Sequence, residues 1–213
     1  VWDEEVSLFW TSPDVNNLGV PYTESFDEGG LLDLWLVDGG DNWLYDEATG
    51  NPAPSMIFNW SPSVTDYSQS LYAPVLPLGD LTTVTVSFDY ELNIWSPSGA
   101  EFFSIEYKSG TDADWSVLEV FDNAGESFDF TNYSFDLTGL SGSLFFRFHA
   151  YGANSFDLNW HRVDNFSVSA PGRDSRNEYD FMGYNVYVDG TLNNSEVFDS
   201  TNYTVYDLNN ELQ

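Results

Sequence analysis

Residues 84–90 read Val84-Thr85-Val86-Ser87-Phe88-Asp89-Tyr90, and this stretch decides the fold class. Apolar and polar side chains alternate along it, so every second residue is hydrophobic. A period of two is typical of a β-strand with one buried face and one face toward solvent. The stretch therefore predicts a strand that covers a hydrophobic core.

The same alternation recurs on the C-terminal side of this strand. Apolar and polar residues alternate over 103–107, a Ser-Gly-Thr-Asp turn follows, and residues 115–120 have the composition of a second strand. This order predicts a β-hairpin over 102–120. Turn-forming residues separate these runs, and helical patterns are almost missing. We therefore expect an all-β jelly-roll sandwich of two antiparallel sheets, with further strands over 128–137, 144–151 and 163–168.

Composition indicates a folded chain, because 42% of the residues are hydrophobic and 18% are aromatic. Disordered acidic segments lack such side chains. There is no cysteine, which excludes disulfides and thiol chemistry. No apolar run approaches the roughly 20 residues of a membrane span, and we expect no membrane insertion.

The charge balance excludes one class of partner. The chain carries 35 acidic residues against 5 Lys and Arg, a formal net charge of −30. Such a field repels phosphate backbones, so we expect no nucleic-acid binding. An acidic shell that stays soluble in brine and a set of specific cation sites both fit this charge.

The chain divides into three parts by pattern. Residues 1–21 are expected to form an N-terminal strand or a linker, 22–170 the sandwich, and 171–213 a partial second module. Residues 27–60 show little alternation and are expected to form long ordered loops. The tail contains two strand-like runs, 183–190 and 201–208, and two strands alone do not bury a core. We therefore expect the tail to be completed by further chain or to dock on the sandwich.

Several short motifs resemble a known family. They are Glu24-Ser25-Phe26, the run Asp38-Gly39-Gly40-Asp41-Asn42-Trp43, the hairpin with Trp115, and Val163-Asp164-Asn165-Phe166-Ser167-Val168. In this order they resemble the cleaved-adhesin or MAM-like jelly rolls of bacterial surface proteins over residues 22–170. The tail resembles a bacterial fibronectin type III module. The resemblance implies a non-catalytic β-sandwich of a secreted or cell-surface protein, joined to other modules of a long chain.

The same resemblance implies calcium as a cofactor. By this resemblance, the calcium ligands would come from the first strand, the loop after it and the closing strand. The candidate ligands are Glu24, Asp27, Asp38, Asp41 and Asp164. Calcium takes six to eight oxygen ligands, which carboxylates and carbonyls supply. The alternative is that these are solvated acids among the 35 of the chain.

Aromatic residues in the non-periodic stretch are the candidates for ligand binding. Exposed aromatic rings can stack on sugars, whereas Trp and Tyr elsewhere plug the ends of a core. Trp95, Trp115 and Trp160 lie at or beside predicted strands and are expected in the core or at its rim. The ligand-binding candidates are Trp43, Tyr45, Trp60 and Tyr67.

No catalytic motif stands out in the sequence. Many carboxylate pairs exist, but none is specific, and the two histidines, His149 and His161, show no zinc spacing and no recognisable triad. We therefore expect no enzyme, and a hydrolase would require a deep cleft with two acids. The predicted function is a calcium-stabilised adhesion module that binds a glycan or an extracellular protein. The alternative is a structural spacer, stalk or filament segment of a large surface protein.

Overall fold

The computed structural model describes residues 19–27, 34–112 and 114–171, together with the backbone of four short strands near the chain ends. The chain forms two compact units, Leu18–Asp174 and a second unit made of Val1–Asn17 and Ser175–Gln213. The first unit is the sandwich, and each unit is described by itself. Among the described residues, no helix has the length and apolar composition to cross a membrane.

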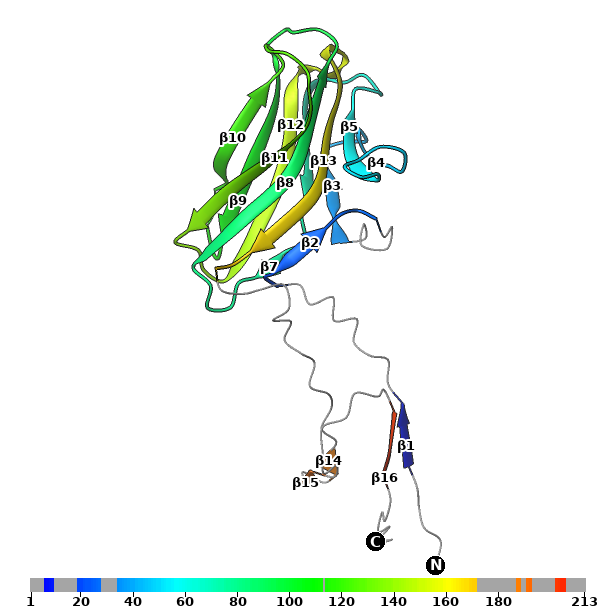
Figure 1. Ribbon diagram of the computed structural model, residues 1–213, viewed down its shortest axis with the longest axis vertical. Coiled ribbons are helices and arrows are strands. Elements are labelled where there is room, and N and C mark those ends of the chain that lie inside the picture. Colours follow the sequence, from blue (N-terminus) through cyan, green and yellow to red (C-terminus); the bar gives the residue numbers. More distant parts are fainter. Residues whose placement is uncertain are drawn as a thin grey trace, which may run out of the picture. The chain divides into compact units, whose positions relative to one another are not determined.

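One sheet of the sandwich has the strand order β10–β9–β12–β6–β3, and β7 also pairs with β12 (Figure 1). All its pairings are antiparallel. The strands are β3 (Leu36–Asp38), β6 (Thr65–Tyr72), β7 (Leu76–Pro77), β9 (Glu101–Ser109), β10 (Ser116–Asp122) and β12 (Ser143–Asn154).

The other sheet has the order β11–β8–β13–β5–β4, and β2 pairs with β13. Its pairings are also antiparallel, which completes the predicted all-β jelly-roll sandwich. The strands are β2 (Tyr22–Glu24), β4 (Trp43–Asp46), β5 (Ser55–Asn59), β8 (Thr83–Ile94), β11 (Phe128–Thr138) and β13 (Leu158–Ser169).

The core lies between the two sheets and is dominated by aromatic rings. The alternating residues of β8 that predicted the fold, Val84, Val86, Phe88 and Tyr90, are all 0% exposed. Across the core, Tyr90 stacks on Phe103 of β9 with a centroid separation of 4.6 Å and an interplanar angle of 3°. The period of two in the sequence is thus the pattern of burial in the structure.

The predicted hairpin over 102–120 is confirmed as β9 and β10. The expectation of loops throughout 27–60 is wrong for three segments, because β3, β4 and β5 lie there. Two of these strands lack the alternation of apolar and polar residues that predicts a strand, and their burial explains why. β3 is exposed at all three of its residues, and β5 is buried at its first four, so neither strand alternates in burial.

The second unit joins both ends of the chain. β1 (Val6–Phe9) pairs with β16 (Asn202–Val205) in an antiparallel register from Val6 opposite Val205 to Phe9 opposite Asn202. A second pair, β14 (Tyr187–Val188) with β15 (Thr191–Leu192), forms a short hairpin. Residues Val6–Phe9 of the N-terminal segment therefore form a strand, and this strand pairs with β16 of the tail, a partner that the sequence pattern did not suggest.

Candidate ligand-binding site

Three loops meet at one end of the sandwich, the upper end in Figure 1. They follow β5, β8 and β12, and backbone hydrogen bonds hold them together. Trp60 N donates to Asn159 O at 3.3 Å, and Trp95 N donates to Asp157 O at 3.1 Å. The short 3₁₀ helix η2 (Ser155–Asp157) lies in the loop between β12 and β13.

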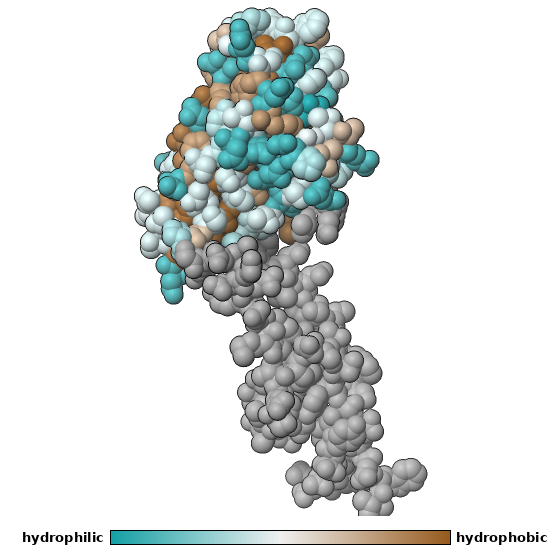
Figure 2. Space-filling model, in the orientation of Figure 1, coloured by the Kyte–Doolittle hydropathy of each residue, from teal (hydrophilic) through white to brown (hydrophobic). Residues whose placement is uncertain are grey.

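An aromatic cavity opens among these loops, with a volume of about 200 Å³. Trp95 is 65% exposed and Phe156 is 47% exposed, while Trp60 is half-buried. The Trp60 and Phe156 rings meet edge to face at 5.3 Å and 90°. Figure 2 shows hydrophobic residues exposed among hydrophilic ones on the visible face of the sandwich. The residues that line the cavity are Trp60, Trp95, Phe156, Leu158 and Asn159; we call them the aromatic cavity.

A buried serine ties together the main chain of the loops that carry the aromatic side chains. Ser155 is fully buried and its hydroxyl donates to Trp60 O at 2.8 Å. The same hydroxyl accepts from Val64 N at 3.0 Å. Asn154 caps η2 by accepting from Phe156 N at 3.1 Å. The loops are therefore ordered before a ligand arrives, which lowers the entropy cost of binding.

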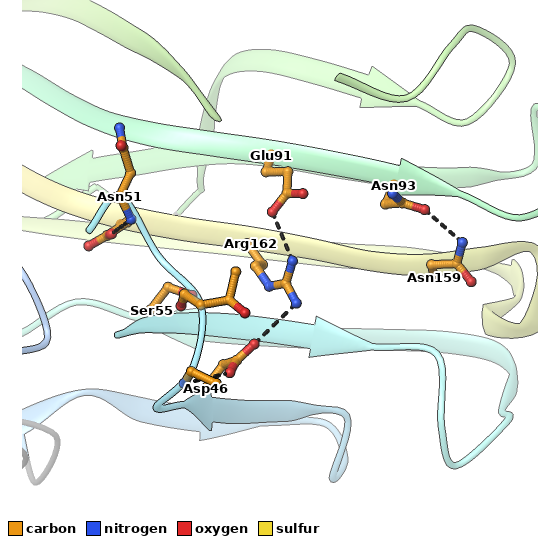
Figure 3. A network of polar contacts seen from close by, with 10 residues as sticks. Asp46, Asn51, Ser55, Glu91, Asn93, Asn159 and Arg162 are labelled. Atoms are coloured by element: carbon orange, nitrogen blue, oxygen red, sulfur yellow. Dashed lines mark hydrogen bonds and ion pairs between the residues drawn. The ribbon is translucent and has the colours of Figure 1, made fainter. Parts of the chain in front are cut away.

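Amide groups line the same end of the sandwich. Asn159 Nδ2 donates to Asn93 Oδ1 at 2.6 Å, and Figure 3 shows this pair bridging β13 and β8. An apolar cavity beside fixed amide groups suits a ligand with one apolar face and several hydroxyls.

Of the four sequence-predicted ligand-binding residues, Trp60 alone lines the aromatic cavity. Trp43 is 4% exposed and packs on Phe58 at 5.8 Å, so its ring belongs to the core. Tyr67 is 7% exposed and stacks on Phe58 at 5.4 Å. Tyr45 is half-buried, and its hydroxyl donates to Phe26 O at 3.1 Å.

Besides Trp60, the aromatic cavity has two aromatic residues that were not predicted to bind a ligand, Trp95 and Phe156. Trp95 immediately follows β8, and its 65% exposure shows that the strand pattern had ended before it. A signal was present in Ser96-Pro97-Ser98-Gly99, a turn sequence that places the preceding tryptophan at the end of a strand. Phe156 carries no such signal, because its neighbours do not alternate.

The structure brings part of the predicted carboxylate set together. Glu24 and Asp27 line one cavity of about 440 Å³ beside Asn165. Asp164 is close enough for its pKa to be raised by the charge of Asp27. Asp38 lies on β3, and Asp41 lines a separate cavity of about 460 Å³. Within the described ranges, no three acidic or histidine side chains form a ready metal-binding group.

Asp164 is the most constrained of these carboxylates. It is fully buried and accepts hydrogen bonds from the backbone amides of Asn51, at 2.5 Å, and Asn165, at 2.7 Å. Burial raises the pKa of Asp164 to about 6, against the opposing effect of these two hydrogen bonds, and the charges of Asp89 and Asp27 add to the rise. Burial also raises the pKa of Glu24.

The fold places the chain with the jelly-roll sandwiches of adhesin and carbohydrate-binding domains. The K1 cleaved adhesin domain of Lys-gingipain from Porphyromonas gingivalis W83 matches with a TM-score of 0.53 and 16% identity, over 72% of this chain and 100% of that domain. TmCBM61 in complex with β-1,4-galactotriose matches with a TM-score of 0.51 and 13% identity, over 74% of this chain and 98% of that one. The K3 cleaved adhesin domain of Lys-gingipain matches with a TM-score of 0.49 and 15% identity, over 70% of this chain and 98% of that domain.

No protein-family model matches the sequence. No curated protein sequence matches it either. The resemblance to cleaved-adhesin jelly rolls is thus confirmed by the structure. A sequence identity of 16% establishes the shared fold and not a shared ligand.

Proposed function

We propose that the sandwich is an extracellular binding module that recognises an uncharged glycan through the aromatic cavity. One observation carries the proposal: Trp95 is 65% exposed, beside a second exposed ring, on loops held by hydrogen bonds. Exposed apolar clusters of this kind mark binding surfaces. The known ligand of one structural neighbour, β-1,4-galactotriose, is a neutral oligosaccharide.

The negative charge of the chain favours an uncharged glycan as the ligand. The chain carries a net charge of −30, so acidic sugars approach against a repulsive field. Stacking on indole and hydrogen bonds to amides depend little on that field. Neutral oligosaccharides are therefore the expected ligands.

Replacing Trp95 by Ala is expected to weaken glycan binding about tenfold or more. Loss of an aromatic contact and of its buried area costs more than about 1.4 kcal/mol, the equivalent of a factor of ten. A screen of immobilised neutral and acidic glycans, followed by calorimetric titration of the best binder, measures this change.

Trp115→Ala is the matched control, because Trp115 is a half-buried indole outside the aromatic cavity, against Arg147. It is expected to keep the affinity of the parent chain. If no glycan binds the parent chain, or if Trp115→Ala weakens binding as much as Trp95→Ala, the proposal fails and a spacer role becomes the better account.

We further propose that calcium stabilises the sandwich at the cavity beside β2. Glu24 and Asp27 would supply carboxylate oxygens there, with backbone carbonyls completing the hard oxygen set that calcium prefers. Asp164 fits a supporting role, since both of its oxygens already accept backbone amides. Asp38 and Asp41 do not line this cavity.

Millimolar calcium is expected to raise the melting temperature above its value in EDTA. Calcium at 100 times its Kd adds about 2.7 kcal/mol, which raises the midpoint of a domain this size by about 5–11 °C. Melts in EDTA, magnesium and calcium at constant sodium chloride measure the effect. Asp27→Asn is expected to remove it and Asp41→Asn to keep it; an equal rise with magnesium or in Asp27→Asn contradicts the site.

A further inference from the structure

Three polar side chains form a hydrogen-bonded chain across the outer face of the β10–β9–β12–β6–β3 sheet. Ser68 lies on β6, His149 on β12 and Glu106 on β9, and these three strands are neighbours in the order β9–β12–β6. Ser68 Oγ is 2.9 Å from His149 Nε2. His149 Nδ1 is 3.1 Å from Glu106 Oε1.

The carboxylate end of this chain is fixed. The side chain of Glu106 is only 7% exposed and its Oε2 pairs with Arg147, whose Nη2 lies 2.5 Å away and whose Nε lies 2.7 Å away. Ser104 Oγ donates to Glu106 Oε1. Burial raises the pKa of Glu106, but the hydrogen bonds from Ser104, His149 and Arg147 and the charge of Arg147 outweigh it and lower the pKa overall.

An ionised Glu106 determines the tautomer of His149. A carboxylate only accepts hydrogen bonds, so Nδ1 carries the proton and Nε2 presents its lone pair to Ser68. Burial lowers the pKa of His149, and the charge of Arg147 lowers it too, against the opposing effect of Glu106. The imidazole is therefore neutral at neutral pH and oriented as a general base toward a hydroxyl.

The hydroxyl end is accessible. Ser68 is exposed and lines the cavity of about 460 Å³ together with Gly39 and Gly40. A Cβ at Gly39 would lie 2.2 Å from the carbonyl oxygen of Ser68, and Gly39 has φ +92°, so only glycine lets this loop pass so close to Ser68. Space for a small substrate thus adjoins Ser68.

We propose that Ser68, His149 and Glu106 form a nucleophilic triad that cleaves small uncharged carboxylic esters. An exposed serine, a neutral imidazole that faces it and a buried carboxylate behind the imidazole match the roles of nucleophile, base and orienting group. The net charge of −30 disfavours phosphate and sulfate esters. This activity goes beyond the proposed glycan binding and does not rest on it.

The reaction proceeds in two balanced steps. Ser68 Oγ bonds to the ester carbonyl carbon while His149 Nε2 takes the hydroxyl proton. The bond to the alcohol oxygen then breaks, and that oxygen takes the proton from Nε2, which leaves an acyl-serine. Water repeats the sequence, releases the carboxylic acid and restores Ser68.

The full chain is tested with p-nitrophenyl acetate and with a fluorophosphonate probe. We expect one probe molecule per chain on the peptide that contains Ser68, and p-nitrophenol release that Ser68→Ala abolishes. His149→Gln is expected to lower the labelling rate 10²–10⁴-fold, the usual contribution of a general base. The labelling rate of the parent chain should rise with pH, with a midpoint below that of a free imidazole, because burial lowers the pKa of His149.

Two variants serve as controls. Ser70→Ala changes a serine two residues away on the same strand, opposite His149 in the β-ladder, and should keep the full rate. Trp95→Ala, which tests the aromatic cavity, should also keep it. The proposal is overturned if the probe does not label Ser68, or if the Ser68→Ala and His149→Gln variants, with unchanged melting temperatures, hydrolyse the ester as fast as the parent chain.

Discussion

Between pH 6.5 and pH 4, the parent chain is expected to lose about 3 kcal/mol of stability relative to a variant in which His161 and Tyr90 are both Phe. His161 is 1% exposed, and burial lowers its pKa to about 3. The unfolded chain takes up a proton as pH falls through about 6.5, whereas the folded chain does not. Stability is therefore lost as pH falls through this window, at about 1.36 kcal/mol per pH unit.

The double replacement is chosen to leave no buried polar group without a partner. Tyr90 Oη lies 2.8 Å from His161 Nδ1, so removal of the imidazole alone would strand a buried hydroxyl. The imidazole also stacks on Phe103 at 4.7 Å, a contact that a phenyl ring retains. Urea unfolding of both proteins across the pH range measures the difference.

Tyr90→Phe alone is the control, since it keeps the histidine and should keep the acid-induced loss. A comparison between proteins is needed because burial raises the pKa values of Glu24, Glu101 and Asp164, to about 6 for Asp164, which favours the folded state as pH falls. The prediction is contradicted if the free energies of unfolding of the parent chain and the double variant change with pH in the same way. That result would show that His161 takes up its proton in the folded state as well.

Replacing Arg162 by Met is expected to cost about 3–5 kcal/mol, because it leaves two carboxylates facing each other without their shared cation. Arg162 Nη1 lies 3.0 Å from Glu91 Oε2, and Nη2 lies 3.1 Å from Asp46 Oδ2. Figure 3 shows both ion pairs. The guanidinium also stacks on Trp160 at 4.3 Å. Chemical denaturation measures the loss.

The control is the triple variant R162M/D46N/E91Q, which removes all three charges together. It should recover most of the lost stability, because neutral amides do not repel each other. If the triple variant is no more stable than Arg162→Met alone, the ion pairs contribute little and the loss comes from packing against Trp160.

The sequence predicted the strands that alternate in burial and missed those that do not. β8 was predicted from the sequence because its inward residues are apolar and most of its outward residues are polar. β3 and β5 are exposed or buried on both faces, so a period-two search passes over them. The pairing of β1 with β16 joins residues nearly a whole chain apart, which no local pattern reports.

The candidate sites depended even more on tertiary structure. Trp60 was predicted as a ligand-binding residue and does line the aromatic cavity, whereas Trp43 carries the same local signals and lies in the core. Ser68, His149 and Glu106 lie on three strands, and only sheet register brings them together. Single-residue signals do not distinguish such cases; the order of strands does.

The most direct test of the central claim is an NMR titration that follows the indole N–H signals of the chain with a neutral oligosaccharide. The chain has eight tryptophans. We expect the signals of Trp60 and Trp95 to shift with the ligand, while those of the buried Trp35 and Trp43 stay in place. Shifts centred on Trp115, or binding that moves neither Trp60 nor Trp95, would contradict it.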